Sequence, residues 1–254
     1  MTTVGSLGDL HPYLAIALGL QARGHQAVLA TGEYYRRKIE ALGLDFRAVR
    51  PDCAWVADRK VMVRFMHPRW GLVRAGRELL PALRESYEDL LGAADGADLL
   101  VSQMPLAARL VAEKTGIPWA STIHMPLFFF STYDLPILPI APVLSSHLRC
   151  LGPAFWGPLL RLSKRATRFL AKPWYRLRAE IGLPPTKDDN PLCDSHSPTL
   201  VLALFSKLLA GKQPDWPPQT VVTGFPLYDQ NEGTGLPPAL RRFLEDGPPP
   251  LVFT

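Results

Sequence analysis

The sequence predicts an α/β fold built on a mostly parallel, doubly wound sheet. Segments of β-forming residues alternate with amphipathic segments near the start of the chain, at the short spacing of right-handed parallel units. Residues 98–102 (DLLVS) are largely apolar, which is typical of a strand covered on both faces. A glycine-containing loop, residues 5–8 (GSLG), separates the first strand from the first helix. Together these features predict helices on both faces of a Rossmann-like sheet.

The chain is expected to begin with a short strand, a loop and a helix. Residues 2–4 are β-formers, and Pro12 suits the first helical position, where its missing N–H costs nothing. Apolar residues then recur at helical spacing up to Arg23, and Gly24 supplies a left-handed stop. The elements expected next are a strand at residues 26–31, a helix at 33–42 and a strand at 45–49.

The middle and end of the chain continue this alternation less regularly. Residues 50–69 show no clean period and are expected to form a long loop, which in a compact domain is usually functional or disordered. Helical spacing returns over residues 70–91, with a break near Gly76 and Pro81. The later expected elements are a strand at 98–102, a helix at 106–115, a strand at 118–123, an extended proline-rich segment at 136–142, strands at 200–204 and 220–223, and a short helix at 236–246. Trp216 is expected to be buried within a rigid turn.

Composition excludes several classes of protein. The chain has 254 residues of which 47% are hydrophobic, enough for a real core, and no apolar run approaches the roughly 18 residues needed to span a bilayer. It shows no secretory signal, so the cytoplasm is the expected compartment. The three cysteines and six histidines lack the spacing of a disulfide framework or a metal site. We therefore expect no bound metal.

Asp9 is the acidic side chain of the first loop, and three interpretations of it stay open. It can complete the turn and favour the positive end of the following helix. It can belong to a dinucleotide-binding loop, although residues 5–8 give only GxxG where the fingerprint needs GxGxxG; Glu33 would then mimic the ribose-binding acid. It can also act as a general base above the carboxyl edge of the sheet, where α/β folds place their ligands.

The opening GSLGDLHPYLAIALGLQARGHQAVLAT resembles that of GT-B glycosyltransferases of the family-28-like and family-1 type, whose signature is G-S-x-G-D-x-x-P-x-x-x-L-A-x-x-L-x-x-R-G-H. Sterol glucosyltransferases, glycopeptide-antibiotic glycosyltransferases and the rhamnolipid rhamnosyltransferase share this pattern. Residues 215–218, 221–226 and 248–254 also match the later part of the N-terminal half in that family. The resemblance covers the whole chain, strongly at both ends and loosely between residues 50 and 195.

The resemblance implies an inverting hexosyltransferase that moves a sugar from a nucleotide-diphosphate donor to a hydrophobic, hydroxyl-bearing acceptor such as a lipid or sterol. It makes Asp9 the base that deprotonates the acceptor hydroxyl. Ser6, Gly8 and His11 become candidate acceptor-binding or loop residues. In the resembling family, the region that corresponds to residues 50–69 lines the acceptor pocket; these residues can instead form a solvated surface segment with Trp55 and Phe65 packed into the core. It implies no cofactor, because the nucleotide sugar is a co-substrate bound mainly by the other half of the fold.

The domain organisation follows from the same resemblance. We expect residues 1–235 to form the N-terminal acceptor-binding domain, and residues 236–254 to form a linker and the first strand of a nucleotide-sugar-binding domain that this sequence lacks. The chain alone would then be inactive. Two alternatives stay open. In the first, the chain is a non-enzymatic acceptor-binding module, or one half of a split glycosyltransferase that works with a separate donor subunit. In the second, it is an NAD(P)-dependent oxidoreductase.

The loop after the strand at 118–123 carries further candidate residues. Three consecutive phenylalanines, residues 128–130, are costly to expose, since each is worth roughly 1.5–3 kcal/mol when buried. Phe128 and Phe129 are expected either to line an apolar acceptor cavity or to pack as ordinary core. His124, at the end of the strand, is expected either to orient the acceptor or to serve as a structural donor.

Residues 145–180 hold eight Lys or Arg and a single acid, Glu180. Within residues 159–172 apolar and basic side chains fall on different faces of a predicted amphipathic helix. The basic face can be a solvated surface over a core-facing stripe, or it can bind anionic lipid headgroups at a membrane surface. Nucleic acid is not expected as a partner, because no helix-turn-helix or single-strand-binding module accompanies the basic segment.

Overall fold

The computed structural model describes residues 1–52, 54–67, 71–103, 105–135, 137, 142–186, 189–229 and 235–251. Within the described residues, six strands form two sheets, one in the order β1-β2 and one in the order β3-β4-β5-β6, and the neighbouring strands of each sheet are parallel. The strands are β1 (Val28–Thr31), β2 (Asp45–Ala48), β3 (Leu100–Ser102), β4 (Trp119–Ile123), β5 (Leu200–Ala203) and β6 (Thr220–Val222). The predicted parallel α/β architecture is thus confirmed.

Thr2 joins the two sheets. It makes parallel bridges to Ala30 of β1 and to Ser102 of β3, so the expected first strand is reduced to a bridging segment. The Thr2 N–H donates to the Val101 carbonyl at 2.8 Å, and the Ala30 N–H donates to the Met1 carbonyl at 2.8 Å. Because of these bonds, β2, β1, the N-terminal segment, β3, β4, β5 and β6 follow one another side by side.

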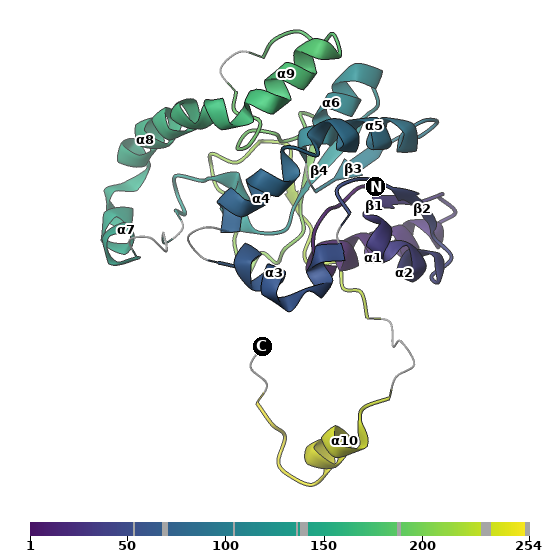
Figure 1. The fold of residues 1–254 in the computed structure, drawn as a ribbon. Helices are drawn as coiled ribbons and strands as arrows, with labels where there is room; N and C mark the ends of the chain where they lie inside the picture. Colours follow the sequence, from purple (N-terminus) through teal and green to yellow (C-terminus); the bar gives the residue numbers. More distant parts are fainter. Residues whose placement is uncertain are drawn as a thin grey trace.

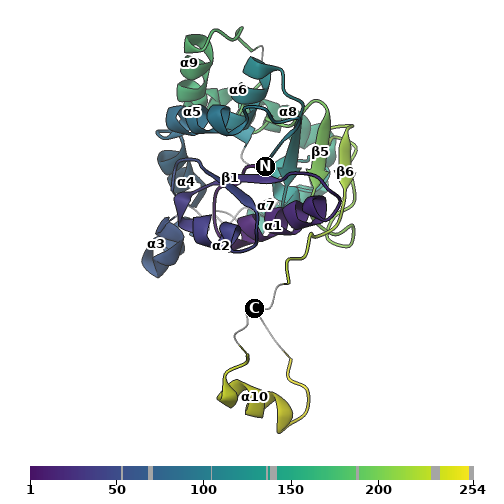
Figure 2. The ribbon, with the colours of Figure 1, turned by 90° about the vertical axis from the view of Figure 1, so that its right-hand side faces the viewer.

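Helices cover both faces of this arrangement. Figures 1 and 2 show α1 and α2 on one side of the strands and α5, α6 and α9 on the other. The α-helices are α1 (Leu7–Gln21), α2 (Arg36–Glu40), α3 (Arg59–Phe65), α4 (Gly71–Leu79), α5 (Leu83–Ala93), α6 (Pro105–Thr115), α7 (Pro142–Leu148), α8 (Gly152–Thr167), α9 (Lys172–Glu180) and α10 (Pro238–Glu245). Short 3₁₀ segments lie at η1 (Glu33–Tyr35), η2 (Ala54–Ala57), η3 (Pro126–Phe129), η4 (Arg149–Leu151) and η5 (Arg168–Ala171).

The strands separate two hydrophobic cores, one against α1 and one against α5, α6 and α9, and neighbouring residues of a strand face different cores. Leu29 packs with buried residues of α1, whereas the next residue, Ala30, packs with α5 and α6. In β4, Trp119 belongs to the core under α5, α6 and α9, and Ala120 belongs to the core under α1. Since neighbouring side chains of a strand point to opposite faces, this division shows that the sheet is doubly wound.

A third core lies beyond the carboxyl end of β4 and β5. Trp216 is buried there and stacks on Phe129 with 4.0 Å between ring centroids, which confirms the predicted burial of Trp216. The neighbouring Asp215 accepts hydrogen bonds from Ser131 Oγ at 2.6 Å and from the Thr132 backbone N–H at 2.6 Å. This turn therefore fixes the loop that follows β4.

Helix α1 begins earlier than the sequence predicted. It starts at Leu7 with Ser6 at the N-cap, so Pro12 lies inside the helix and Asp9 lies in its first turn instead of in the loop. Pro12 removes the N–H that would reach the carbonyl four residues back and its ring crowds that carbonyl, yet the helix continues past it. It is followed by Gly24, whose φ of 83° confirms the expected left-handed stop.

Two other expectations also need correction. The predicted loop at residues 50–69 contains η2 and α3, and Asp58 caps α3 by accepting from the Lys60 N–H at 2.8 Å. The helix predicted over residues 70–91 is divided into α4 and α5 by a break that includes Pro81, as expected, but α4 runs through Gly76. A proline breaks a helix because it removes a donor and clashes with the preceding turn, whereas a glycine only weakens it.

The predicted basic helix at residues 159–172 is also divided. Its residues lie in α8, η5 and the start of α9, and its apolar side chains do not form a core-facing stripe. Leu162 is 64% exposed and Phe169 is 71% exposed. The interpretation of this segment as a polar face over a buried stripe is therefore wrong.

The remaining expectations concern the proline-rich stretch, the C-terminal region and membrane-spanning helices. Most of the proline-rich stretch at 136–142 and the last three residues lie outside the described part of the chain. Helix α10, near the predicted domain boundary at residue 235, stands apart from the other elements in Figures 1 and 2, and the boundary itself stays a prediction. Among the helices that the structure describes, none is long and apolar enough to cross a membrane.

Leu14 lies at the centre of the core between α1 and the sheet, where it is 0% exposed. We expect Leu14→Ala to lower the free energy of unfolding by about 2–5 kcal/mol, because the truncation removes buried contacts and leaves a cavity. Urea unfolding followed by circular dichroism measures this change. The matched control is Leu208→Ala, since Leu208 is 98% exposed and its truncation should change the same quantity by less than about 0.5 kcal/mol. Equal losses in both variants would contradict the placement of the core.

Candidate functional site

Three neighbouring strand ends bring polar side chains together beside the start of α1. Asp9 follows the N-terminal segment through Thr2, Gln103 follows β3 and His124 follows β4. These three segments are adjacent and parallel, so their carboxyl ends open on the same edge. The carboxylate of Asp9 lies at the centre of this cluster.

Backbone and side-chain donors of Ser6 hold one oxygen of Asp9. Asp9 Oδ2 accepts from the Ser6 backbone N–H at 2.7 Å and from Ser6 Oγ at 3.1 Å. Asp9 is the third residue of α1, where a carboxylate satisfies an exposed N–H of the helix start and favours the positive end of the helix dipole. The capping interpretation of Asp9 is thus confirmed, although it does not exclude a further role.

The other oxygen of Asp9 faces the ends of β3 and β4. Asp9 Oδ1 accepts a hydrogen bond from Gln103 Nε2, and Gln103 Oε1 accepts one from Thr3 Oγ1. His124 Nδ1 lies 3.8 Å from Asp9 Oδ1, and both ring nitrogens of His124 are buried without a hydrogen-bond partner among the described residues. The carboxylate is therefore oriented from three sides.

These neighbours determine the charge of Asp9. Burial raises the pKa of its carboxyl group, but the His124 side chain and the hydrogen bonds from Gln103 and Ser6 outweigh burial and hold that pKa below its ordinary value. Asp9 is therefore ionised at neutral pH. Its side chain is 29% exposed, so the carboxylate is still accessible from solvent.

Gly5 allows the close approach of the Asp9 carboxylate. A Cβ atom at Gly5 would lie 2.2 Å from Asp9 Oδ2, and the φ of Gly5 is 140°, a conformation that side chains rarely adopt. Its carbonyl accepts a hydrogen bond from Tyr35 Oη at 2.8 Å, which ties the loop to η1. Any larger residue at this position would displace either the loop or the carboxylate.

Tyr13 connects α1 to the strand that precedes His124. Its hydroxyl forms a buried hydrogen bond with Thr122 Oγ1 at 2.8 Å, and its ring meets the His124 ring edge-on with 6.1 Å between centroids. Because Thr122 lies in β4 and Tyr13 in α1, this contact locks the helix to the strand that carries His124.

An open groove of about 620 Å³ borders the start of α1. It combines the first residues of the helix with aromatic, apolar and basic side chains; its lining is Ser6, Leu7, Gly8, Tyr34, Tyr35, Arg37, Lys38, Val56 and Met62. Two of these, Ser6 and Gly8, are residues that the sequence singled out. Val56 and Met62 come from η2 and α3, within the segment expected to line an acceptor pocket.

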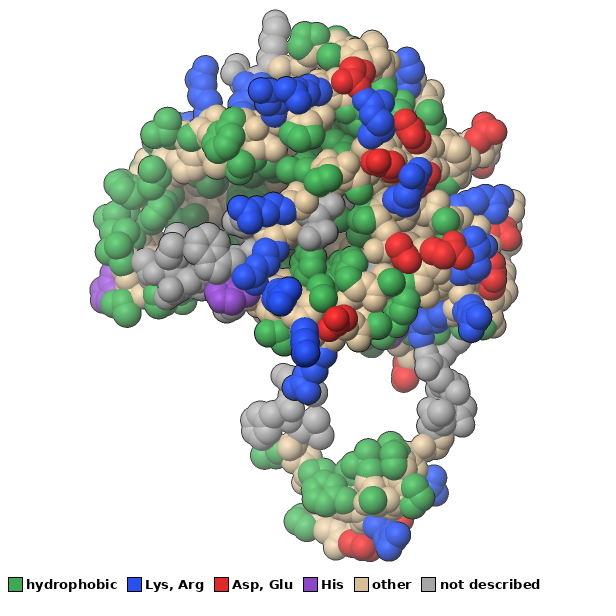
Figure 3. Space-filling model, in the orientation of Figure 1, with side chains coloured by type: hydrophobic (Ala, Val, Ile, Leu, Met, Phe, Trp, Pro, Cys, Tyr) green, Lys and Arg blue, Asp and Glu red, His purple; other side chains and the backbone are tan. Residues whose placement is uncertain are grey.

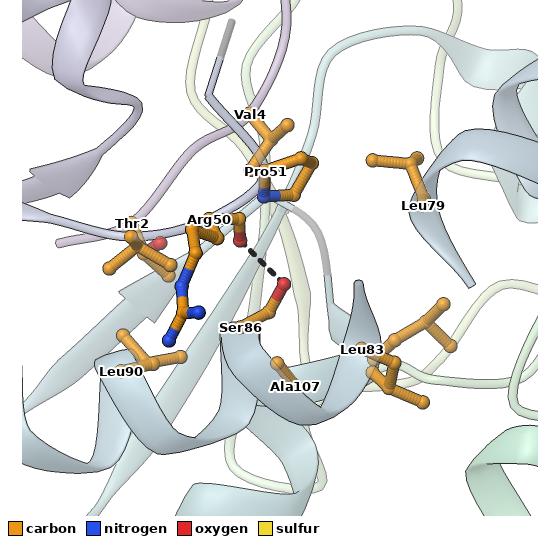
Figure 4. Close-up of a pocket in the computed structure, with 11 residues that line it drawn as sticks. Thr2, Val4, Arg50, Pro51, Leu79, Leu83, Ser86, Leu90 and Ala107 are labelled. Carbon is orange, nitrogen blue, oxygen red and sulfur yellow. Dashed lines mark hydrogen bonds between the residues drawn. The ribbon is translucent and has the colours of Figure 1, made fainter. Parts of the chain in front are cut away.

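A second, much smaller cavity of about 40 Å³ lies between the N-terminal segment, the end of β2 and α5. Figure 4 shows its lining, in which Ser86 Oγ donates to the Arg50 carbonyl at 2.5 Å beside Leu83, Leu90 and Pro51. A cavity of this size has room for only a few water molecules, so it is too small for an organic substrate.

The other predicted residues lie at the margin of the site or outside it. His11 points from α1 towards Tyr228, with 4.9 Å between the ring centroids. Phe128 is partly exposed, whereas Phe129 is buried against Trp216 and belongs to the third core. Gln103 was not among the candidates; its signal was its place directly after the strand at 98–102, the same kind of position as that of His124.

Residues 1–133 match the model of the glycosyltransferase family 28 N-terminal domain. The chain belongs to this family. The match identifies a glycosyltransferase domain, in place of the NAD(P)-dependent oxidoreductase that residues 5–8 had left open.

Named relatives agree with this glycosyltransferase assignment. The whole chain is 32% identical to O-mycaminosyltylonolide 6-deoxyallosyltransferase from Streptomyces fradiae and covers 60% of that protein. It is 25% identical over its whole length to a sterol 3-beta-glucosyltransferase from Arabidopsis thaliana, of which it covers 40%. Among solved structures, the glycotransferase of kitacinnamycin matches with a TM-score of 0.55 and 18% identity, over 92% of this chain and 52% of that one. The chain thus spans about half of a GT-B glycosyltransferase fold.

The glycosyltransferase domain offers no metal site within its described part, where no group of three or more His, Cys, Asp or Glu side chains is placed to hold an ion. Cys150 and Cys193 are free thiols, and Cys53 lies outside the described residues.

We expect Gly5→Ala to displace the Asp9 carboxylate, because the new methyl group would overlap Asp9 Oδ2. Loss of the Ser6 hydrogen bonds should then raise the pKa of Asp9 towards its ordinary value, which an NMR titration of the carboxyl carbon measures. The matched control is Gly92→Ala in α5, where an added Cβ meets nothing within 4 Å. An unchanged Asp9 pKa in Gly5→Ala would contradict the proposed constraint.

The contribution of Asp9 to stability should depend on pH. Its folded-state pKa lies below the unfolded value of 3.8, so the ionised carboxylate favours folding above that pH, and this contribution is lost as the pH falls through the folded pKa. We expect the difference in unfolding free energy between the natural chain and Asp9→Asn to be constant near neutral pH and to shrink below about pH 3.8. Urea unfolding at several pH values measures it; a difference that grows on acidification would reverse the sign assigned here.

Proposed function

We propose that this chain is the acceptor-binding half of an inverting glycosyltransferase in which Asp9 is the general base. The observation that carries this proposal is the ionised, partly exposed Asp9 carboxylate at the edge where three parallel strands end. A carboxylate held by several donors keeps one orientation, which a base needs in order to meet an acceptor hydroxyl.

The proposed reaction is a single displacement. The acceptor O–H donates a hydrogen bond to Asp9, and its oxygen forms a bond to the anomeric carbon of the sugar. The bond between that carbon and the nucleotide diphosphate breaks, and the diphosphate leaves with the electron pair. The acceptor proton passes to the Asp9 carboxylate.

The low pKa of Asp9 determines when the proton moves. A carboxylate of this acidity does not deprotonate an alcohol in the ground state. The acceptor oxygen becomes much more acidic as its bond to the anomeric carbon forms, so Asp9 receives the proton late in the transition state. A positioned base of this kind contributes about 10²–10⁴-fold to the rate.

We propose a hydrophobic acceptor that carries a hydroxyl group. The groove beside α1 presents Tyr34, Tyr35, Val56 and Met62 together with the polar residues Ser6 and Gly8, which suits a largely apolar molecule with a polar end. The names of two relatives, which mention O-mycaminosyltylonolide and a sterol, support the same class. The proposed donor is a nucleotide-diphosphate sugar, and the group that it transfers is a hexose.

The proposed division of labour places residues 1–235 in the acceptor domain and residues 236–254 in the connection to a donor-binding half. That half is either a continuation of the polypeptide or a separate subunit, and it would supply the contacts to the nucleotide. The separation of α10 from the other helices in Figure 1 supports this division.

The test is Asp9→Asn in the transferase assembled with its donor-binding half. We expect the turnover number to fall by about 10²–10⁴-fold while binding of the nucleotide sugar is retained, since the substitution removes the base but keeps the side-chain shape. Turnover is measured by mass spectrometry of the glycosylated acceptor, and donor binding by calorimetry. The control is Asp95→Asn, an exposed acid in the turn after α5, which should leave both quantities unchanged. Full turnover in Asp9→Asn would refute the base assignment.

A further inference from the structure

Helix α8 and its flanking segments expose an unusual number of large apolar side chains. Figure 3 shows hydrophobic side chains gathered over α7 and α8, with Lys and Arg side chains along the upper edge over α8 and α9. The exposed apolar residues of these segments are Val143, Leu144, Leu151, Phe155, Leu159, Leu162, Phe169 and Leu170. A surface of this kind on a monomer indicates an interaction site.

The exposed residues of α8 are arranged in a regular pattern. Phe155, Leu159 and Leu162 are spaced four and three residues apart, so they lie on one face of the helix. At 3.6 residues per turn, Arg161 and Arg165 lie about 60–100° around the helix from Leu162 and border the apolar stripe. We call these five residues the outer α8 face.

The opposite side of α8 is attached to the body of the domain. Lys164 forms an ion pair with Asp194 at 2.5 Å, and its backbone carbonyl accepts from Asn190 Nδ2 at 3.0 Å. Trp156 Nε1 donates to the Leu148 carbonyl at 2.9 Å, which fixes α8 to the end of α7. Since the inner side of α8 has its partners within the domain, the outer α8 face is a second, outward-facing surface.

The charge of this region is strongly positive. Residues 145–180 contain eight cations and one acid, and that acid, Glu180, is ion-paired with Arg84. Of the cations, Arg161 and Arg165 of the outer α8 face have exposed side chains, and Lys172 at the start of α9 is exposed as well. An apolar stripe bordered by exposed cations complements a partner whose surface is anionic and whose interior, just beneath that surface, is apolar.

We propose that the outer α8 face docks on the surface of an anionic lipid bilayer. The apolar stripe would enter the boundary between headgroups and acyl chains, while the bordering cations would contact the phosphates, as in interfacial amphipathic helices. A second copy of the chain fits this surface poorly, because pairing two such faces would bring like charges together. The proposal concerns the location of the enzyme and does not depend on the role of Asp9.

Vesicle flotation of the intact chain tests this proposal. Vesicles of phosphatidylcholine alone are compared with vesicles that contain about 30% phosphatidylglycerol, at low and at high salt. We expect recovery with anionic vesicles to exceed recovery with neutral vesicles by about fivefold or more, and to fall at high salt. Equal recovery with both vesicles, or none with either, would overturn the proposal.

Two double variants separate the apolar and cationic contributions. Phe155→Ser with Leu162→Ser and Arg161→Gln with Arg165→Gln should each reduce recovery with anionic vesicles by about tenfold. Their controls are Leu208→Ser with Leu227→Ser, which changes exposed leucines elsewhere, and Arg241→Gln with Arg242→Gln in α10. Circular dichroism verifies that each variant is folded. Equal losses in test and control variants would show non-specific adsorption. A stable dimer that dissociates in Phe155→Ser with Leu162→Ser would show that a second copy is the partner. Either outcome refutes membrane docking.

Discussion

The contact between the Asp9 carboxylate and the start of its own helix is the constraint on which the site depends. Asp9 Oδ2 occupies the space that a side chain on Gly5 would need, and it takes up the Ser6 N–H that would otherwise be unsatisfied. The same carboxylate offers Oδ1 to Gln103 from the neighbouring strand end. A single side chain therefore both fixes where α1 begins and stands at the carboxyl edge of the sheet, so the structural role of Asp9 does not exclude the role proposed for it as a base.

The arrangement also explains why the charge of Asp9 is stable in a partly buried place. Burial alone would favour the neutral acid, but each oxygen has donors that favour the anion. Gln103 can keep its donor aimed at Asp9 because its own carbonyl oxygen is held by Thr3. His124 adds a polarisable neighbour at 3.8 Å without a competing partner among the described residues. The edge of the sheet thus supplies a prepared electrostatic environment before any substrate is present.

The sequence predicted the strands and the parallel fold well because apolar runs and glycine stops are local signals. It misplaced the start of α1, since Pro12 is a strong marker for a first helical turn while the Ser6–Asp9 pair is a less conspicuous one. It did not find Gln103, whose importance arises only when β3 lies beside the N-terminal segment. It left the two roles of Phe129 open, because its burial depends on Trp216, almost ninety residues later in the chain. Long-range packing of this kind has no periodic signature.

The turn at Asp215 and Trp216 holds the loop that follows β4, although the two segments are far apart in the sequence. A substitution or exchange of one segment therefore affects the other. The loop after β4 follows directly from His124, yet its position is held by the ring of Trp216 and by the carboxylate of Asp215. A chimaera that imported this loop from a relative without the matching turn would deprive Trp216 of its stacking partner and Asp215 of its hydrogen-bond donors. Exchanges of this loop between relatives are therefore better made as paired cassettes, in which the loop and the turn come from the same protein.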